Sequence, residues 1–222
     1  MQITQKTLYF SRLIMDIFSL TDKLTPTLNG MLPGKRAQQR MITQPRTTFD
    51  PPYSEDQAIP SAVLILLHPA KQDIRFFLTQ RTHDVAHHKG QISLPGGVQE
   101  KNESLSDTAL RETHEEIGID EDGISILGKL TPLFIPFTGF MVHPFIGWMP
   151  DSPSPKPDTN EVYHLFSVSI IELLNENFVH EETVNFQGQN ILLPYYLFDK
   201  KKVWGATAMI LSEFKTILRK TL

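Results

Sequence analysis

Two hydrophobic patterns organise this chain, and each predicts a different kind of element. Residues 62–68 are almost continuously apolar, which is typical of a buried strand. A turn follows at residues 69–73, and residues 74–81 predict a second strand that forms a hairpin with the first. Between residues 105 and 117 the apolar positions recur every three or four residues, which predicts an amphipathic helix.

The same patterns predict elements along the rest of the chain. We expect strands at residues 124–133, 140–148 and 161–168, a short helix at 170–174, a hairpin formed by 183–187 and 191–198, and a last helix at 206–220. Helical spacing at residues 7–23 predicts an N-terminal helix, whereas residues 24–60 predict an extended, irregular arm. We therefore expect a helix and arm in residues 1–55 and one domain in residues 56–222.

The helix at residues 105–117 carries the most informative side chains. Ser104 followed by Asp107 predicts a capping box, and Gly118 lies where a left-handed C-cap is expected. Positions three and four apart share a helix face, so three carboxylates project together, those of Glu112, Glu115 and Glu116. Such a patch is unfavourable unless a cation lies within it.

The chemistry of these residues indicates which cation would bind. Oxygen ligands favour Mg²⁺ or Mn²⁺ over Zn²⁺, because the chain has no cysteine and only one histidine lies nearby. Arg111 is placed to hold a carboxylate through a forked pair of hydrogen bonds. Residues 95–97, Pro-Gly-Gly, let the backbone approach a ligand or metal closely.

Acidic runs on helices are usually solvated faces, but the complete spacing here resembles the Nudix box. The matching positions are Gly97, Glu103, Arg111, Glu112, Glu115, Glu116, Gly118 and Ile119. The one departure is Thr113, which occupies an aliphatic position and is small enough to pack there.

The segment before the box extends the resemblance toward the coenzyme A pyrophosphatases. Their signature reads Leu-Leu-Thr-any-Arg, Ser or Ala, a spaced Arg, a spaced Gly, and Phe-Pro-Gly-Gly. Here residues 77–81, Gly90 and residues 94–97 are similar to it. The departures are Phe77, Thr82, Ala86 and Leu94. Ala86 replaces the spaced arginine, and His87, His88 or Lys89 could supply that positive charge instead.

This resemblance implies an α+β protein with the Nudix fold, an α/β/α sandwich around a central mixed sheet. It implies hydrolysis of a pyrophosphate joined to another moiety, with Mg²⁺ or Mn²⁺. The implied metal ligands are the Gly96 carbonyl, Glu112, Glu115 and Glu116. Arg111 is expected to orient Glu112, and the base that activates water is either Glu115 or Glu161. The expected substrate contacts are Arg81, His88, Gly90, Pro95 and Gly97.

The composition narrows the range of partners. The formal net charge of −4 does not favour nonspecific binding to nucleic acid. The absence of cysteine excludes disulfides and thiolate metal sites. No apolar run approaches the ~18 residues of a membrane span, and Ser11, Arg12 and Asp16 interrupt the N-terminal apolar stretch. We expect a soluble cytoplasmic protein, monomeric or homodimeric, that acts on a small molecule.

Three functions are consistent with these observations. A coenzyme A pyrophosphatase would release 3′,5′-ADP and 4′-phosphopantetheine or its acyl form. Another Nudix pyrophosphatase would act on ADP-ribose, NADH or a dinucleotide. A binding or regulatory Nudix domain would have no turnover, but such domains usually lack box carboxylates, and here all of them are present.

Overall fold

A computed structural model describes residues 16–44, 52–82, 90–186 and 188–222. Its main sheet has eight strands and is mixed, because β1 and β7 run parallel and the other paired strands run antiparallel. The strands of this sheet are β1 (Ile59–Ala70), β2 (Asp73–Arg81), β3 (Ile92–Ser93), β4 (Gly96–Val98), β5 (Ser125–Lys129), β6 (Leu133–Ile135), β7 (Phe140–Trp148) and β8 (Val162–Ser169).

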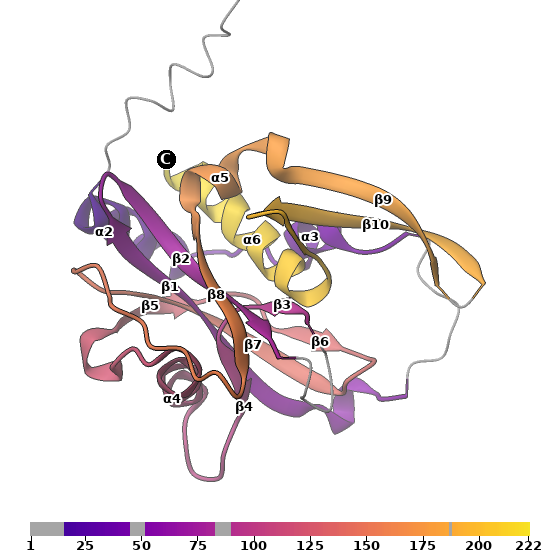
Figure 1. Cartoon of the computed structure of the whole chain (residues 1–222), viewed down its shortest axis with the longest axis horizontal. Coiled ribbons are helices and arrows are strands. Elements are labelled where there is room, and N and C mark those ends of the chain that lie inside the picture. Colours follow the sequence, from indigo (N-terminus) through magenta and orange to yellow (C-terminus); the bar gives the residue numbers. More distant parts are fainter. Residues whose placement is uncertain (1–15, 45–51, 83–89, 187) are drawn as a thin grey trace, which may run out of the picture.

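Helices cover both faces of this sheet, as the sandwich architecture requires (Figure 1). They are α2 (Ile17–Leu28), α3 (Lys35–Gln38), α4 (Leu105–Ile117), α5 (Ile170–Leu174) and α6 (Gly205–Thr221), with short 3-10 turns η1 (Gln39–Met41), η2 (Glu55–Gln57), η3 (Glu121–Gly123) and η4 (Glu176–Phe178). A smaller sheet of β9 (Val179–Phe186), β10 (Gln189–Phe198) and β11 (Lys201–Val203) lies on the α6 side.

The alternation of side chains along β1 explains why this strand is apolar throughout. Ile65 and Leu67 belong to one buried cluster, which includes Phe214 of α6. Leu64 and Leu66 belong to a second cluster on the opposite face, together with residues of α4. A strand covered on both faces has no exposed row of side chains, and its sequence is therefore almost continuously hydrophobic.

The predicted hairpins and the box helix are confirmed. β1 and β2 pair antiparallel with Leu67 opposite Phe76, and β9 and β10 form the second hairpin. α4 has the predicted capping box, and Gly118 at its C-cap adopts the left-handed conformation with φ 66°. The buried Thr113 donates its hydroxyl proton to the Ala109 carbonyl at 2.7 Å, which satisfies the one polar group at the aliphatic position.

Other predictions need correction. A helix was predicted at residues 7–23, of which residues 7–15 lie outside the described part; the described helix, α2, runs from Ile17 to Leu28. The predicted irregular arm contains α3 and η1. The strand predicted at residues 124–133 is divided into β5 and β6, because the backbone N–H of Thr131 donates to the Glu213 side chain at 3.3 Å. β11 was not predicted.

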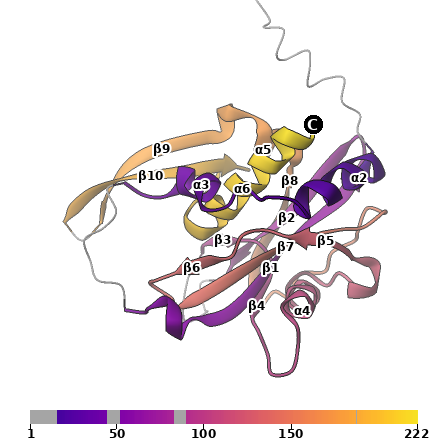
Figure 2. The same ribbon diagram turned by 180° about the vertical axis from the view of Figure 1, so that it is seen from behind.

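The N-terminal elements pack against the end of the chain. Figure 2 shows α2 and α3 on the α6 side of the main sheet, the side opposite α4. Ile17, Leu20, Leu24 and Leu28 of α2 are buried in the same cluster as α6. None of the helices in the described ranges is both long and apolar enough to span a bilayer.

Candidate active site

The centre of the candidate site is Glu116, in the last turn of α4. Only 2% of its side chain is exposed, and Arg81 Nη1 lies 3.4 Å from its Oε1 atom. Within the described part of the chain, its Oε2 atom is buried and has no hydrogen-bond partner. Burial raises the pKa of Glu116 to about 8, although Arg81 opposes this increase. Glu116 is therefore a buried carboxylate with incomplete compensation.

Glu112 lies one helical turn before Glu116, and Glu115 immediately precedes it. Both carboxylates are bound by a single arginine, Arg111. Arg111 Nη1 donates to Glu112 Oε1 at 2.9 Å and to Glu115 Oε2 at 2.8 Å. Glu112 is mostly buried, whereas about half of the Glu115 side chain is exposed. Burial raises the pKa of Glu112, and Arg111 counteracts this effect.

Arg111 is itself held in place by a fourth carboxylate. Its Nε and Nη2 atoms donate to the two oxygens of Glu103 at 3.1 and 3.0 Å, and Nη2 also donates to the Val98 carbonyl. This forked hydrogen bond lowers the pKa of Glu103 to about 2. Arg111 thus connects the loop before α4 to the acidic face of the helix.

The two glycines of β4 allow the backbone to approach this face. At Gly96, φ is 153°, and a Cβ atom would overlap the backbone of Ala62 and Val63. At Gly97, a Cβ atom would overlap the carboxylate of Glu112. Side chains at these two positions would therefore displace either β1 or Glu112.

A turn centred on Asp158 places Glu161 near the same carboxylates. The Asp158 N–H donates to the Glu116 carbonyl at 3.0 Å, and the Asp158 carbonyl accepts from the Glu161 N–H at 3.1 Å. The Thr82 N–H donates to the Glu161 carbonyl at 3.0 Å. The negative charge of Glu161 contributes to the raised pKa of both Glu112 and Glu116.

The residues of this site fit a hard divalent cation. The donors are carboxylate oxygens, the Glu116 Oε2 atom lacks a partner within the described ranges, and the Gly96–Gly97 backbone borders them. In those same ranges, no three Asp, Glu or His side chains are already arranged around one point. Arg81 and Arg111 instead hold the carboxylates in their present positions.

The remaining predicted site residues lie in different surroundings. Arg81, expected to contact phosphate, pairs with Glu116. Pro95 is buried, and its carbonyl accepts from the Leu64 N–H at 2.9 Å. The Gly90 carbonyl accepts a hydrogen bond from the Gln80 side chain. His88 lies outside the described residues.

Sequence reasoning did not identify the roles of Glu103 and Asp158 in this site. The position of Glu103, eight residues before Arg111, was a visible signal for their ion pair. Asp158 gave no such signal, because its contribution is made through backbone groups of a Pro- and Ser-rich loop.

Comparison with known proteins supports the same family. The NUDIX domain profile matches residues 58–187, more than half of the chain. A protein named uncharacterized Nudix hydrolase NudL from Photorhabdus laumondii is 33% identical over 153 residues, which cover 68% of this chain and 81% of the relative. The corresponding protein of Pectobacterium atrosepticum is 31% identical, over 73% of this chain and 83% of the relative.

Among solved structures, the MutT protein from Methanosarcina mazei is 19% identical with a TM-score of 0.48, covering 78% of this chain and 99% of that one. The family assignment follows from the profile and from the relatives above 30% identity. With the box helix, its capped ends and its carboxylates in place, the chain belongs to the Nudix hydrolase family.

Proposed function

We propose that this Nudix hydrolase cleaves the pyrophosphate of coenzyme A or its thioesters. The buried Glu116 is the main support for pyrophosphate hydrolysis, because its Oε2 atom has no partner in the described ranges. The substrate is supported by the sequence of residues 77–97, which resembles the coenzyme A pyrophosphatase signature. The products would be 3′,5′-ADP and 4′-phosphopantetheine or its acyl form.

Glu112 and Glu116 are the residues best placed to hold Mg²⁺ or Mn²⁺, together with the Gly96 carbonyl and Glu115. When bound, divalent cations neutralise phosphate charge and lower the pKa of bound water. A pyrophosphate brings dense negative charge to an already acidic face, so this neutralisation is required for binding. Arg111 keeps Glu112 and Glu115 in fixed orientations through its Nη1 atom.

We assign the water-activating base to Glu161 in preference to Glu115. Arg111 engages the Glu115 carboxylate at 2.8 Å, which occupies one of its oxygens. The Glu161 carboxylate has no hydrogen-bond partner among the described residues, and its charge acts on the pKa of Glu112 and Glu116. Glu161 is therefore free to accept a proton from water, and Glu161→Gln is expected to reduce kcat more than Glu115→Gln.

The substrate assignment is tested by incubating the purified protein with Mg²⁺ or Mn²⁺ and a panel of substrates. The panel contains coenzyme A, an acyl-coenzyme A, NADH and ADP-ribose, and products are separated by chromatography. We expect 3′,5′-ADP and 4′-phosphopantetheine from coenzyme A at the highest kcat/KM. Clear turnover of ADP-ribose or NADH without turnover of coenzyme A would reassign the substrate and leave the pyrophosphatase reaction in place.

A further inference from the structure

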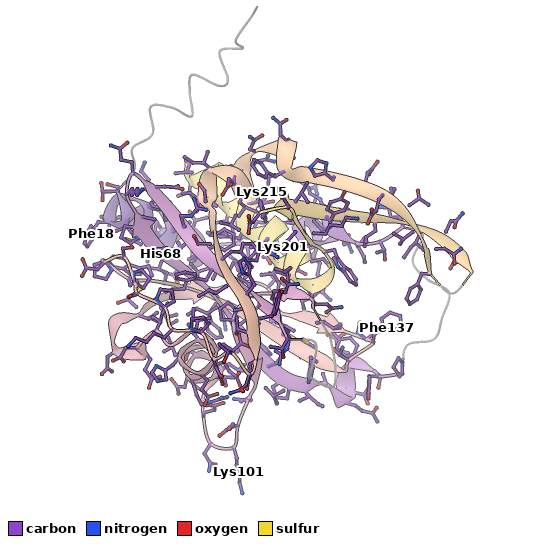
Figure 3. The ribbon with its side chains drawn as sticks, in the orientation of Figure 1. Phe18, His68, Lys101, Phe137, Lys201 and Lys215 are labelled. Atoms are coloured by element: carbon purple, nitrogen blue, oxygen red, sulfur yellow. The ribbon has the colours of Figure 1, made fainter. Side chains whose placement is uncertain are left out.

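A lysine occupies an inward-facing position on the last strand of the smaller sheet. In β11, Lys201 and Val203 share one face, since side chains alternate along a strand, and Val203 is completely buried. Lys202, on the other face, pairs with Glu182. Figure 3 shows Lys201 near the middle of the molecule, whereas Lys101 lies at the tip of the loop before α4. Lys201 is thus a half-buried cation between the two sheets.

The partner of this lysine is a neutral amide. Lys201 Nζ donates to Gln80 Oε1 at 3.0 Å, and Gln80 Nε2 donates to the Gly90 carbonyl at 3.4 Å. Within the described part of the chain, no carboxylate forms an ion pair with Lys201, although the nearby Lys202 and Lys215 each have one. A partly desolvated ammonium is stabilised by an anion more than by an amide, so Lys201 retains capacity for an anionic ligand.

The position of Gln80 connects this lysine to the active site. Gln80 immediately precedes Arg81, the partner of Glu116, at the C-terminal end of β2. Consecutive residues of a strand lie only ~3.3 Å apart and project to opposite faces. The Lys201–Gln80 pair and the Arg81–Glu116 pair therefore lie at adjacent positions of the same strand end, where the pairing with β8 shifts register.

Neighbouring side chains make the Lys201 side of the sheet suitable for a nucleotide. His164 of β8 lies opposite Gln80 in the strand register. Its ring stacks on Phe166, with 5.7 Å between the ring centroids. The His164 Nε2 atom also lies 3.5 Å from Asp199 Oδ2. Aromatic rings of this kind can stack on a nucleobase, while a cation beside them attracts its phosphates.

We propose that Lys201 and Gln80 form a second anion site, which binds a phosphate monoester on the ribose of the substrate. The inference rests on the proposed function, because coenzyme A carries a 3′-phosphate in addition to its pyrophosphate. Arg81 and Glu116 would then lie beside the pyrophosphate, and Lys201 beside the monoester. Gln80 lies within the segment matched by the family profile, residues 58–187, whereas Lys201 lies beyond it.

The proposal is tested by calorimetric titration with 3′,5′-ADP and with 5′-AMP, which differ only in the monoester. We expect the wild-type protein to bind 3′,5′-ADP at least about tenfold more tightly, as one hydrogen bond between charged groups provides. Lys201→Met should abolish this preference, and Lys201→Arg should keep most of it. Lys202→Met, which removes the adjacent outward-facing lysine, is the matched control and should leave the preference unchanged.

These titrations need no turnover, so they give a result even if coenzyme A proves not to be a substrate. An equal affinity of the wild-type protein for both nucleotides would overturn the proposal. So would a preference that persists in a Lys201→Met protein whose melting curve shows that it is folded. If that variant does not fold, the proposal stands only if the wild-type protein prefers 3′,5′-ADP and Lys201→Arg keeps most of this preference.

Discussion

Two buried glutamates lie on opposite sides of the main sheet, and they differ in how completely their carboxylates are hydrogen-bonded. Glu213 of α6 is completely buried and accepts hydrogen bonds from the Thr131 side chain and N–H, the Gln38 side chain and the Gly34 N–H, at 2.7 to 3.3 Å. Glu116 of α4 faces Arg81 at 3.4 Å, and one of its oxygens has no partner in the described ranges.

We infer that this difference separates a structural carboxylate, Glu213, from the proposed catalytic one, Glu116. Buried polar groups in folded proteins are normally satisfied, and a fully satisfied network rigidifies the core around it. Glu213 meets this condition through donors from three residues, Gly34, Gln38 and Thr131. Glu116 does not meet it, and an unsatisfied buried carboxylate is favoured only where a ligand completes its surroundings.

The largest expected effect is the loss of activity in Glu116→Gln. Removing one preorganised electrostatic group typically reduces kcat by about 10²–10³-fold, and we expect the upper end for this residue. The melting temperature should not fall, because the substitution replaces a carboxyl group whose ionised form is poorly compensated. Steady-state assays and thermal melts of this variant and of Glu121→Gln, an exposed control, check both points. A fully active Glu116→Gln protein would exclude this residue from the catalytic centre.

Glu213→Ala should have the opposite profile. The substitution leaves several buried donors without an acceptor, and we expect a loss of about 3 kcal/mol in the free energy of unfolding. The kcat of the remaining folded protein should change little. Urea denaturation measures the free energy of unfolding of Glu213→Ala and of Glu181→Ala, an exposed control on β9. A variant that stays as stable as the control while losing catalysis would show that the two glutamates have been assigned the wrong way round.

The raised pKa of Glu116 predicts a pH effect that a cation reverses. Because this pKa is about 8 in the folded protein and near 4.5 when unfolded, the folded state binds an extra proton between these values. The contribution of Glu116 to stability is therefore full below pH 4.5 and is lost as the pH rises toward 8. Between pH 5.5 and 7.5 the free energy of unfolding should fall by at most about 2.7 kcal/mol for this reason.

The measurement compares the wild-type protein without metal to Glu116→Gln, since the two share the opposing effect of His68, whose pKa burial lowers. We expect the stability difference to grow with pH in favour of the variant. Added Mg²⁺ or Mn²⁺ should stabilise the wild-type protein more at pH 7.5 than at 5.5. A difference independent of pH would contradict the raised pKa.

The smallest of these effects is expected for Arg111→Lys. A lysine cannot reproduce the fork to Glu103 while also bonding Glu112 and Glu115, so we expect kcat/KM to fall about tenfold. Arg75→Lys provides the matched control, because Arg75 makes similar ion pairs with Asp73 and Glu172 elsewhere in the fold. Equal activities of the two variants would mean that Arg111 serves stability alone.

Much of the fold and of the helix-borne site was predictable because the signals are local. The caps of α4 depend on residues three positions apart, and the β1–β2 hairpin depends on two apolar runs joined by a short turn. The box spacing likewise placed Glu112, Glu115 and Glu116 on the same helix.

The parts that could not be predicted depend on contacts between distant residues. The interruption of the strand at Thr131 reflects its hydrogen bonds to Glu213, 82 residues away. The pairing of Arg81 with Glu116 links β2 to α4 across 35 residues, and only the folded chain reveals it. No periodicity or motif encodes such pairs.

The hydrogen bond between the Gly34 N–H and Glu213, 179 positions apart, has a consequence for synthesis on the ribosome. Helices α2 and α3 emerge early, but their packing partner α6 is made only after residue 204. Until then the apolar side chains of α2 lack their final neighbours. A nascent chain arrested before α6 should therefore expose this surface and bind chaperones, and protection of α2 from proteases should appear only after α6 has emerged from the ribosome.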